Sequence, residues 1–402
     1  MNGSQINAPS LNQYQRSAMI VGGIGLVLAL VGAVIDRTQF WQSYLFAYIF
    51  WLEVGLGCLG LLMLHHLVGG RWSALIRRMM EAGAMTLPWL ALLFLPLLLG
   101  LTTLYPWTNA AHVQESELLQ AKSAWLNVPF FIGRALLYLI IWAGLAFQLN
   151  RWSQAQDESG DPAWGIKMRR LSAVGILLYV LTATFAGFDW MMSLEPEWFS
   201  SIYGLLFIAG QGIAAIALAI IGLNLLAGVN ADDAEWVKPR NDLGNLLLGF
   251  VMIWAYFSFS QFLIIWSANI PEEAVWYFHR TQGGWKEVTI VLIALHFVLP
   301  FLLLLARGLK RSARWLTALA IFIFLARLID LFWQIMPAFY PDGLHMHWLD
   351  LALVCAIGGG WIWLFVRQWA GRPLVALHDP QLEQHEHIAG IEPANGTQMS
   401  QV

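Results

Sequence analysis

The sequence predicts an all-α polytopic membrane protein with ten transmembrane helices. Of its 402 residues, 58% are hydrophobic and only 12% are charged, and the mean hydropathy is +0.61. These values lie outside the range of soluble globular domains. Ten apolar runs are each long enough to cross a bilayer, which takes about 20 residues. None of them alternates between polar and apolar residues, so a lipid-facing β-barrel is excluded.

The ten predicted helices follow one another through short polar connections, with longer ones at 105–127, 150–170, 228–243 and 268–286. The first run is too long for the core of a typical signal peptide, so we expect it to remain as an anchor. Residues 1–16 form a polar N-terminus, 17–370 the membrane domain and 371–402 a polar tail that we expect to be mobile. The predicted helices are 17–35, 44–68, 85–104, 128–149, 171–191, 201–227, 244–267, 287–308, 314–336 and 348–370.

Basic residues predict the orientation of these helices. We number each loop by the helix that precedes it. The N-terminus, the even-numbered loops and the C-terminal flank hold 16 of the 22 Lys and Arg residues, whereas the odd-numbered loops hold four. Loops rich in Lys and Arg stay in the cytoplasm. We therefore expect a multi-pass protein of the cell's inner (plasma) membrane with both termini in the cytoplasm.

A weak internal repeat predicts two bundles. The segments SYLFAYIFWLEVGLG (43–57) and SIYGLLFIAGQGIAA (201–215) align without gaps and place Glu53 opposite Gln211. WLNV (125–128) likewise resembles WKEV (285–288) at the starts of the fourth and eighth helices. We predict four-helix bundles from helices 2–5 (about 43–192) and 6–9 (201–337), with the first and tenth helices added.

Ionisable side chains interrupt five of the apolar runs. A charge at mid-bilayer costs about 2.5–3.5 kcal/mol on insertion scales, so such residues usually face the bundle interior and mark an ion or proton pathway. Polar residues at helical spacing extend the set. The residues predicted to form a buried proton path are Glu53, Arg134, Asp189, Gln211, Tyr256, Ser260, His296, Arg327 and Asp330.

A purely structural reading of these charges is also open. Arg327 could neutralise Asp330 one turn away, and Arg134 could pair with Glu53 or Asp189. Glu53 differs because no cation shares its helix and its repeat mate is a neutral Gln. We therefore expect Glu53 to be a carboxyl group that takes up and releases a proton.

The sequence predicts no redox cofactor or metal in this chain. Haem ligation of the cytochrome b type needs two axial histidines on facing helices, but His65 and His66 lie at a different depth from His296, and no CxxCH occurs. The two cysteines, Cys58 and Cys355, are too few for an iron–sulfur cluster. Electron carriers, if any, must belong to partner subunits.

Two stretches carry a family resemblance, TATFAGFDWMMSLEPEWFSSIYGLLFI (182–208) and WAYFSFSQFLIIWSANIPEEAVWYFHR (254–280). They resemble the NrfD/polysulfide-reductase family of membrane subunits, most closely the ActF-type subunits of alternative complex III. The similarity extends from about residue 15 to 370. It implies ten helices, two four-helix bundles and cytoplasmic termini.

The resemblance further implies a membrane subunit of a quinol:electron-acceptor (cytochrome c-type) oxidoreductase. Its partners would be a sister NrfD-like membrane subunit, an iron–sulfur subunit with Fe–S clusters and c-type cytochrome subunits with haem c, in a lipid bilayer and without nucleic acid. Asp189 and Trp190 would be the quinone contacts, with menaquinone or its quinol as the ligand. Ala183 stands where the sister subunits carry a His six residues before the matching Asp, so we expect the reactive quinol site in the sister subunit.

Two alternatives to this function remain. An autonomous ion-coupled transporter would also combine repeated bundles with buried carboxylates, although both predicted repeats enter from the same side, unlike the inverted repeats of many carriers. A purely structural docking subunit would use the intramembrane charges only as interhelical contacts.

Overall fold

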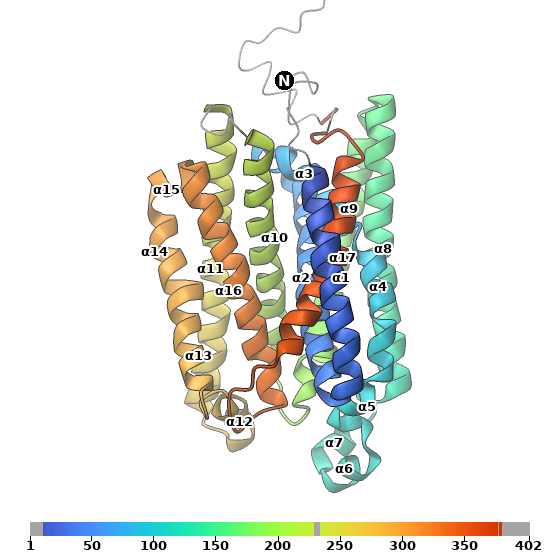
Figure 1. Cartoon of the computed structure of the whole chain (residues 1–402), viewed down its shortest axis with the longest axis vertical. Helices are drawn as coiled ribbons and strands as arrows, with labels where there is room; N and C mark the ends of the chain where they lie inside the picture. The colour runs from blue at the N-terminus through green and yellow to red at the C-terminus, as the bar shows by residue number, and fades with distance from the viewer. Residues whose placement is uncertain (1–10, 229–233, 377, 380–402) are drawn as a thin grey trace, which may run out of the picture.

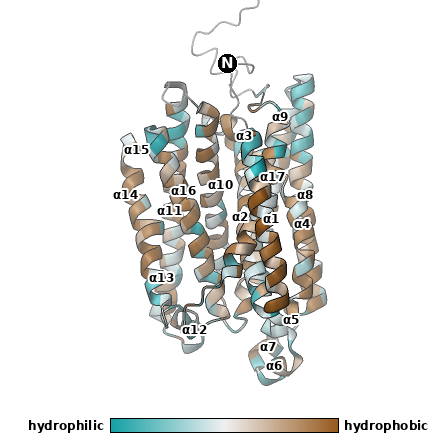
Figure 2. Ribbon diagram, in the orientation of Figure 1, coloured by the Kyte–Doolittle hydropathy of each residue, from teal (hydrophilic) through white to brown (hydrophobic). Residues whose placement is uncertain are grey.

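The computed structural model describes residues 11–228, 234–376 and 378–379, and it is built from helices laid side by side along one long axis (Figure 1). No strand occurs in these ranges, so the predicted all-α class is confirmed. Ten helical stretches are long and apolar enough to cross a membrane, and each overlaps one predicted run. The third begins at Trp72, 13 residues before the predicted start at 85. Apolar residues fill the middle of the helices and polar ones gather toward their ends (Figure 2).

The first half of the chain begins with two long helices, α1 and α2. The third candidate span is broken into short pieces at Pro88 and Pro96, and short helices form the loop that follows it. The bounds are α1 (Leu11–Ile35), α2 (Arg37–Val68), α3 (Arg71–Ala84), α4 (Leu87–Leu93), η1 (Leu95–Leu99), α5 (Leu101–Leu104), η2 (Pro106–Thr108), α6 (Ala110–Glu115), α7 (Glu117–Lys122), α8 (Val128–Ser159), α9 (Ala163–Trp190) and η3 (Met192–Leu194).

The second half contains the remaining five candidate spans. The eighth is interrupted by a π-helical turn, η5. The bounds are α10 (Tyr203–Ala227), α11 (Ala234–Ala268), α12 (Pro271–His279), α13 (Trp285–Leu292), η5 (Ile293–Val298), α14 (Leu299–Leu305), α15 (Arg307–Arg311), α16 (Ala313–Ile335), η6 (Met336–Ala338) and α17 (Trp348–Ala370).

Two helices form the centre of the molecule. α2 is almost wholly buried and packs against α3, α9, α10 and α17, while α10 packs against α2, α9, α11 and α16. They approach closely at Gly57, where a Cβ atom would lie 2.1 Å from the Gln211 carbonyl oxygen. Glycine is thus required for this crossing. The two halves meet along α2 and α10, and the division into two four-helix bundles stays a prediction.

α1 is held on the outside of the molecule by α17 (Figure 1). Small residues let their backbones touch: a Cβ on Gly22 would lie 2.9 Å from Gly359 Cα, and one on Gly25 2.6 Å from Ala356 N. Close approach through small residues is a common mode of helix packing in membranes. The remaining faces of α1 are largely exposed.

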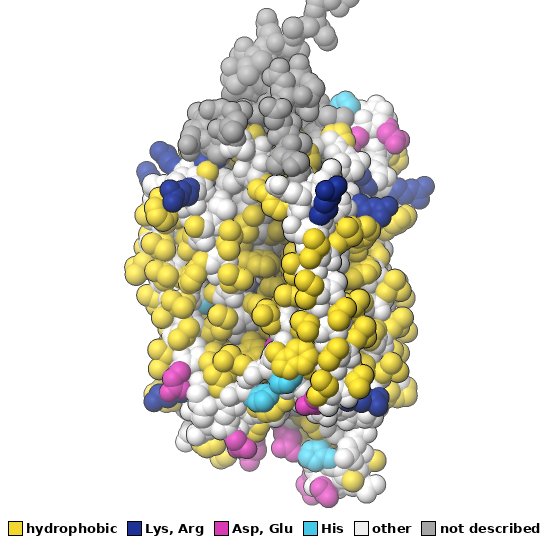
Figure 3. All heavy atoms as spheres, in the orientation of Figure 1, with side chains coloured by type: hydrophobic (Ala, Val, Ile, Leu, Met, Phe, Trp, Pro, Cys, Tyr) yellow, Lys and Arg dark blue, Asp and Glu magenta, His cyan; other side chains and the backbone are white. Residues whose placement is uncertain are grey.

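The surface carries a hydrophobic belt between two polar ends (Figure 3). Lys and Arg side chains gather at the end where α9 begins and α15 lies, and they include the exposed Arg169, Arg170 and Arg311. The opposite end, with α6, α7 and α12, carries acidic residues such as Glu117 and Glu272. We call these the basic end and the acidic end.

Candidate functional site

The central feature of the interior is an ion cluster that joins the two halves of the chain. Arg327 on α16 faces Glu53 on α2, with Nη2 2.5 Å from Oε1 and Nε donating to Oε2 at 3.1 Å. Arg327 Nη1 also donates to Asp330, one turn along α16. All three side chains are buried, with at most 1% of their surface exposed. We call these residues, together with His296, the central cluster.

Glu53 pairs with Arg327 on another helix, and not with Arg134, the partner that the sequence left open. Arg327 lies 274 positions away in the sequence and reaches Glu53 because α2 and α16 both pack against α10. Gly210 on α10 makes room for the guanidinium, since a Cβ there would lie 2.3 Å from Arg327 Cζ. The two-point fork between Arg327 and Glu53 is the strongest common geometry for such a pair.

Asp330 connects the ion pair to a histidine. Its Oδ2 accepts hydrogen bonds from Trp254 Nε1 at 3.0 Å and from Gln334 Nε2 at 3.2 Å. His296 Nδ1 lies 3.9 Å from the same oxygen, and its ring stands edge-on to Trp254 at 4.4 Å between centroids. His296 is thus next to the cluster without being hydrogen-bonded to it.

His296 is unusual in both backbone and side chain. It lies in the π-helical turn η5, and such turns inside α-helices are frequent at functional sites. The side chain is fully buried, and neither ring nitrogen has a hydrogen-bond partner among the described residues. A buried imidazole without partners can accept a proton if a nearby anion stabilises the charge.

The charges of the central cluster do not balance. Two carboxylates, Glu53 and Asp330, face the single guanidinium of Arg327. Fully ionised, the group would carry one net negative charge in a buried place, and an uncompensated buried charge costs several kcal/mol. One proton shared among Glu53, Asp330 and His296 would remove that cost. The geometry therefore suits a site that binds and releases one proton.

Polar groups continue from the central cluster to the acidic end. Arg280 Nη2 donates to the Gln334 backbone oxygen at 2.8 Å and to Glu195 Oε2 at 2.9 Å. His279 Nδ1, on a side chain that is 28% exposed, lies 2.9 Å from Glu195 Oε1. Burial of Glu195 opposes its ionisation, but the Arg280 and His279 contacts outweigh this and hold its pKa below the usual range. Sequence reasoning assigned Arg280 to a loop and missed this connection.

Toward the basic end the next polar groups are Gln211 and Tyr179. Tyr179 donates to Gln211, whose side-chain nitrogen is buried without a hydrogen-bond partner among the described residues. One turn beyond Tyr179, α9 packs against apolar side chains: a Cβ on Gly175 would lie 2.8 Å from Met63 Sδ and 3.1 Å from Leu145 Cδ2.

A second buried ion pair links α8 and α9. Arg134 Nε and Nη2 donate to Asp189 Oδ2 and Oδ1 at 2.8 and 2.7 Å, and Tyr138 and Trp125 each donate one further bond to the same carboxylate. Arg134 therefore pairs with Asp189, one of the two partners that the sequence left open. Here the charges balance, and both carboxylate oxygens are fully engaged.

Trp190 completes this second site. It is 1% exposed, and its ring contacts Tyr48, Phe94, Tyr138 and Trp142. Aromatic rings thus fill the space beside the Asp189 carboxylate. Its indole nitrogen is buried without a hydrogen-bond partner among the described side chains.

Besides Arg134 and Asp189, two more residues of the predicted proton path lie away from the central cluster. Tyr256 on α11 is 66% exposed on the outer face of the molecule, and Ser260, one turn along, is half-buried. The two residues share one face of α11 as predicted, but that face points away from the interior of the protein. The structure thus brings together Glu53, His296, Arg327 and Asp330, with Gln211 adjacent.

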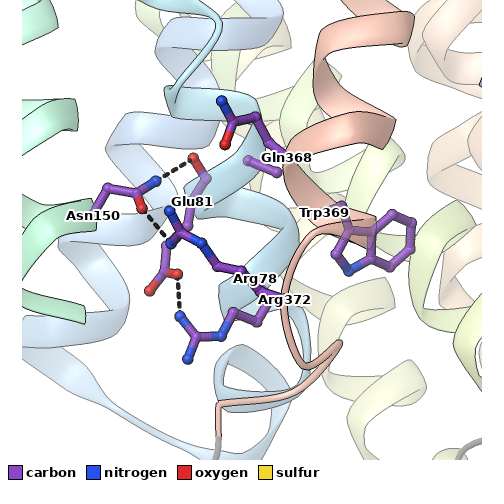
Figure 4. A pocket seen from close by; sticks show the side chains of 7 residues that line it. Arg78, Glu81, Asn150, Gln368, Trp369 and Arg372 are labelled. Atoms are coloured by element: carbon purple, nitrogen blue, oxygen red, sulfur yellow. Dashed lines mark hydrogen bonds and ion pairs between the residues drawn. The ribbon is translucent and has the colours of Figure 1, made fainter. Parts of the chain in front are cut away.

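A third polar network lies near the basic end and was not foreseen. Arg77 and Arg78 on α3 share Glu81 and reach Ser153 and Asp157 on α8. Figure 4 shows part of it, a small pocket where Arg372 donates to Asn150 beside Arg78 and Glu81, with Gln368 and Trp369 on the other wall. The sequence predicted Arg77 and Arg78 in the connection 69–84 between the second and third helices rather than in a buried network.

The first part of the predicted mobile tail docks on this network. Asp379 is 2% exposed and lies 3.0 Å from Arg77 Nη1 and 3.2 Å from His65 Nε2. Asp379 therefore lies against α2 and α3. Residues 380–402, like residues 1–10 of the predicted N-terminus, lie outside the described part of the chain.

The fold and the site together define a polytopic helical membrane protein with buried ion clusters. Within the described ranges no group of three or more His, Cys, Asp or Glu residues is placed to hold a metal ion. No family model and no curated protein matches this chain.

Proposed function

We propose that this chain is a proton-binding membrane subunit of a quinol:electron-acceptor oxidoreductase of the alternative complex III type. The observation that carries the proton-binding role is the central cluster, in which two buried carboxylates share one guanidinium. Beside them lies a histidine whose ring nitrogens have no hydrogen-bond partner among the described residues. The assignment to a redox complex rests on the FDWMMSLEP and FSQFLIIWSANIPEE stretches and their resemblance to NrfD-type subunits.

The proton would exchange with the acidic end of the molecule. From Asp330 the polar groups of Gln334, Arg280 and Glu195 lead to the partly exposed His279. In this proposal, the apolar contacts around Met63 close the path toward the basic end. Such one-sided access is what a coupling subunit needs, because a conformational change must intervene before the proton can reach the other side.

Quinol oxidation itself belongs to a partner subunit in this proposal. A reactive quinone site needs a free proton acceptor, yet Asp189 is saturated by Arg134, Tyr138 and Trp125, and aromatic rings surround Trp190. The residues present therefore do not fit a reactive quinone. The sister membrane subunit would hold that site, with Fe–S clusters and haem c in further subunits.

The exposed face of α11 supports assembly with another membrane subunit. Its residues Met252, Tyr256, Phe259, Leu263 and Trp266 recur at spacings of four and three, and all are at least 43% exposed. This spacing is that of a helix packing seam, and aromatic residues and Met are enriched in interfaces. The Tyr256 hydroxyl lies about 18 Å from the end of α11, at membrane depth, without a partner among the described residues. A neighbouring transmembrane helix would supply one.

Orientation follows from the same proposal. The basic end would face the cytoplasm of a cell with this chain in its plasma membrane, because Lys and Arg stay on that side. The acidic end, with Glu195 and His279, would then face outward. Protons bound at the central cluster would be exchanged with the outer side.

The test is to replace Glu53 and Asp330 singly, as E53Q and D330N, in the assembled complex. Both amides keep the shape and part of the hydrogen bonding but remove the surplus negative charge. We expect electron transfer to continue and the number of protons released per electron to fall. D350N is the matched control, since Asp350 is a buried carboxylate bonded to Ser43 at 2.5 Å, away from the cluster.

The outcomes separate the three functions. If E53Q and D330N both leave turnover and proton output unchanged, the cluster is a structural contact and the docking-subunit alternative holds. If the chain purifies alone from its native membrane, without haem or iron–sulfur partners, the transporter alternative is favoured instead. Loss of proton output in D350N as well would show that the effect is not specific to the central cluster.

A further inference from the structure

A groove of about 420 Å³ opens on the molecule between α1, α2, α4 and α17. Small residues of α1 and α17 form its floor, including Gly23 and Ala356, and aromatic residues such as Phe40 and Trp363 form its walls. All of these positions belong to candidate membrane spans. The groove therefore opens to hydrocarbon rather than to water.

The dimensions of the groove fit one extended hydrocarbon chain. On α1 it runs from Ala18 to Leu30, a rise of about 18 Å, which is close to the thickness of about 15 Å of one leaflet's hydrocarbon. An empty groove of this size would forfeit the dispersion contacts of its lining.

The chemistry of the lining selects an apolar occupant. No lining residue is charged, and the one hydroxyl among them, on Tyr44, already donates to the Leu93 carbonyl oxygen at 2.8 Å. A quinone ring is held by donors to its carbonyl oxygens, and the side-chain donors left in the lining are the indole N–H groups of Trp89 and Trp363. Retained quinone is therefore one outcome of the test below. The tail of a lipid requires no hydrogen-bond donor.

A cation lies at the outer mouth of the groove. Arg37 is the first residue of α2, three positions before Phe40, and its exposed side chain makes no ion pair or hydrogen bond with any described residue. A guanidinium at this place complements a phosphate. The neighbouring Asp36 carboxylate is engaged in capping α2 through the Gln39 amide.

We propose that this groove is a binding site for one phospholipid, with an acyl chain between α1 and α17 and its phosphate at Arg37. Apart from Arg37 the site recognises no headgroup, so it selects a phosphate-bearing lipid over a neutral one. The bound chain would complete the packing of α1, which otherwise rests mainly on α17. This proposal does not depend on the redox role.

The test fills the groove by mutation in the full-length protein. A Cβ on Gly23 meets no atom within 4 Å, so the G23L side chain would enter the groove without displacing protein. G144L is the matched control, because Gly144 also has open space but lies on α8, outside the groove. Phospholipid and quinone that stay bound after detergent washing are quantified by mass spectrometry.

We expect the wild type and G144L to retain about one phospholipid per chain. G23L should retain it about fifteenfold more weakly, which corresponds to two methylene groups of the acyl chain displaced from the groove. R37Q should weaken retention of phospholipid but not of diacylglycerol. If G23L does not fold, a phospholipid with a photoreactive acyl chain should label residues 18–30 and 353–363 in the wild type. Equal retention in G23L and wild type, retained quinone instead of phospholipid, or equal labelling of α8 would each overturn the proposal.

Discussion

Replacing Gly210 with alanine should weaken the ion pairs of the central cluster, although it changes no charged residue. The added Cβ would lie 2.3 Å from both Cζ and Nη2 of Arg327, so the guanidinium must retreat by about 1 Å to reach an ordinary contact. At an effective dielectric constant of about 20, lengthening the 2.5 Å contact with Glu53 by that amount loses about 2 kcal/mol. G210A should therefore be destabilised despite alanine's better helix propensity.

The control for this change is G144A on α8, where a Cβ meets nothing within 4 Å. Glycine to alanine in a helix should stabilise that variant by about 0.5–1 kcal/mol. The assay is thermal unfolding of the purified chain in detergent, followed by tryptophan fluorescence. The expected order of Tm is G144A at or above wild type, and wild type above G210A.

The cause can be checked by a double-mutant cycle. In an E53Q background the charged partner is already gone, so adding G210A should cost clearly less than it does in the wild type. A G210A variant with the Tm of G144A would refute the reasoning, because the helix at Gly210 would then have room that the structure does not show. Equal cost of G210A in both backgrounds would show that the loss is steric and unrelated to the Arg327–Glu53 pair.

Two further predictions concern the other ion pairs. Arg280 and His279 hold the pKa of Glu195 below its unfolded value of about 4.3, so their contacts with Glu195 stabilise the protein above that pH, and this stability is lost as the pH falls further. The Tm difference between wild type and E195Q should therefore shrink between pH 6 and pH 3.5. A constant difference would contradict this prediction. R134M leaves the Asp189 charge buried alone and should cost about 3–5 kcal/mol, whereas R134M/D189L removes both charges and should recover most of the loss; a double variant as unstable as R134M would refute this. Thermal unfolding measures both.

The sequence predicted the depth of the buried charges but not all of their partners. Hydropathy places Glu53, Arg327 and Asp330 inside apolar runs, and helical spacing puts Arg327 beside Asp330. The pairing of Glu53 with Arg327 spans 274 positions and depends on how α2, α10 and α16 cross, which no local pattern encodes. Gly210 was the available signal, because a small residue at a helix crossing can admit a long side chain.

Spacing alone also could not predict which side of a helix faces the interior of the protein. Tyr256 and Ser260 follow a helical stripe, and a polar stripe in a membrane helix usually faces inward. Here the stripe is exposed, because the interior side of α11 is taken by residues such as Trp254 and Leu247. Likewise Arg280 and Glu195 looked like loop residues, although Arg280 is only 1% exposed. In both cases tertiary packing determined whether the side chains are buried, although the local pattern was predicted correctly.

Charge balance distinguishes the central cluster from two other ion pairs. Arg134 and Asp189 match one to one, and so do Arg280 and Glu195. Balanced and hydrogen-bonded groups gain nothing from an added proton, because protonation would leave a cation uncompensated. At the central cluster the surplus carboxylate reverses that preference. In the function proposed above, this surplus makes Glu53, Asp330 and His296 the groups that bind the proton. A single added cation beside the cluster, as in Gln211→Lys, should therefore abolish proton uptake and leave the other two ion pairs intact.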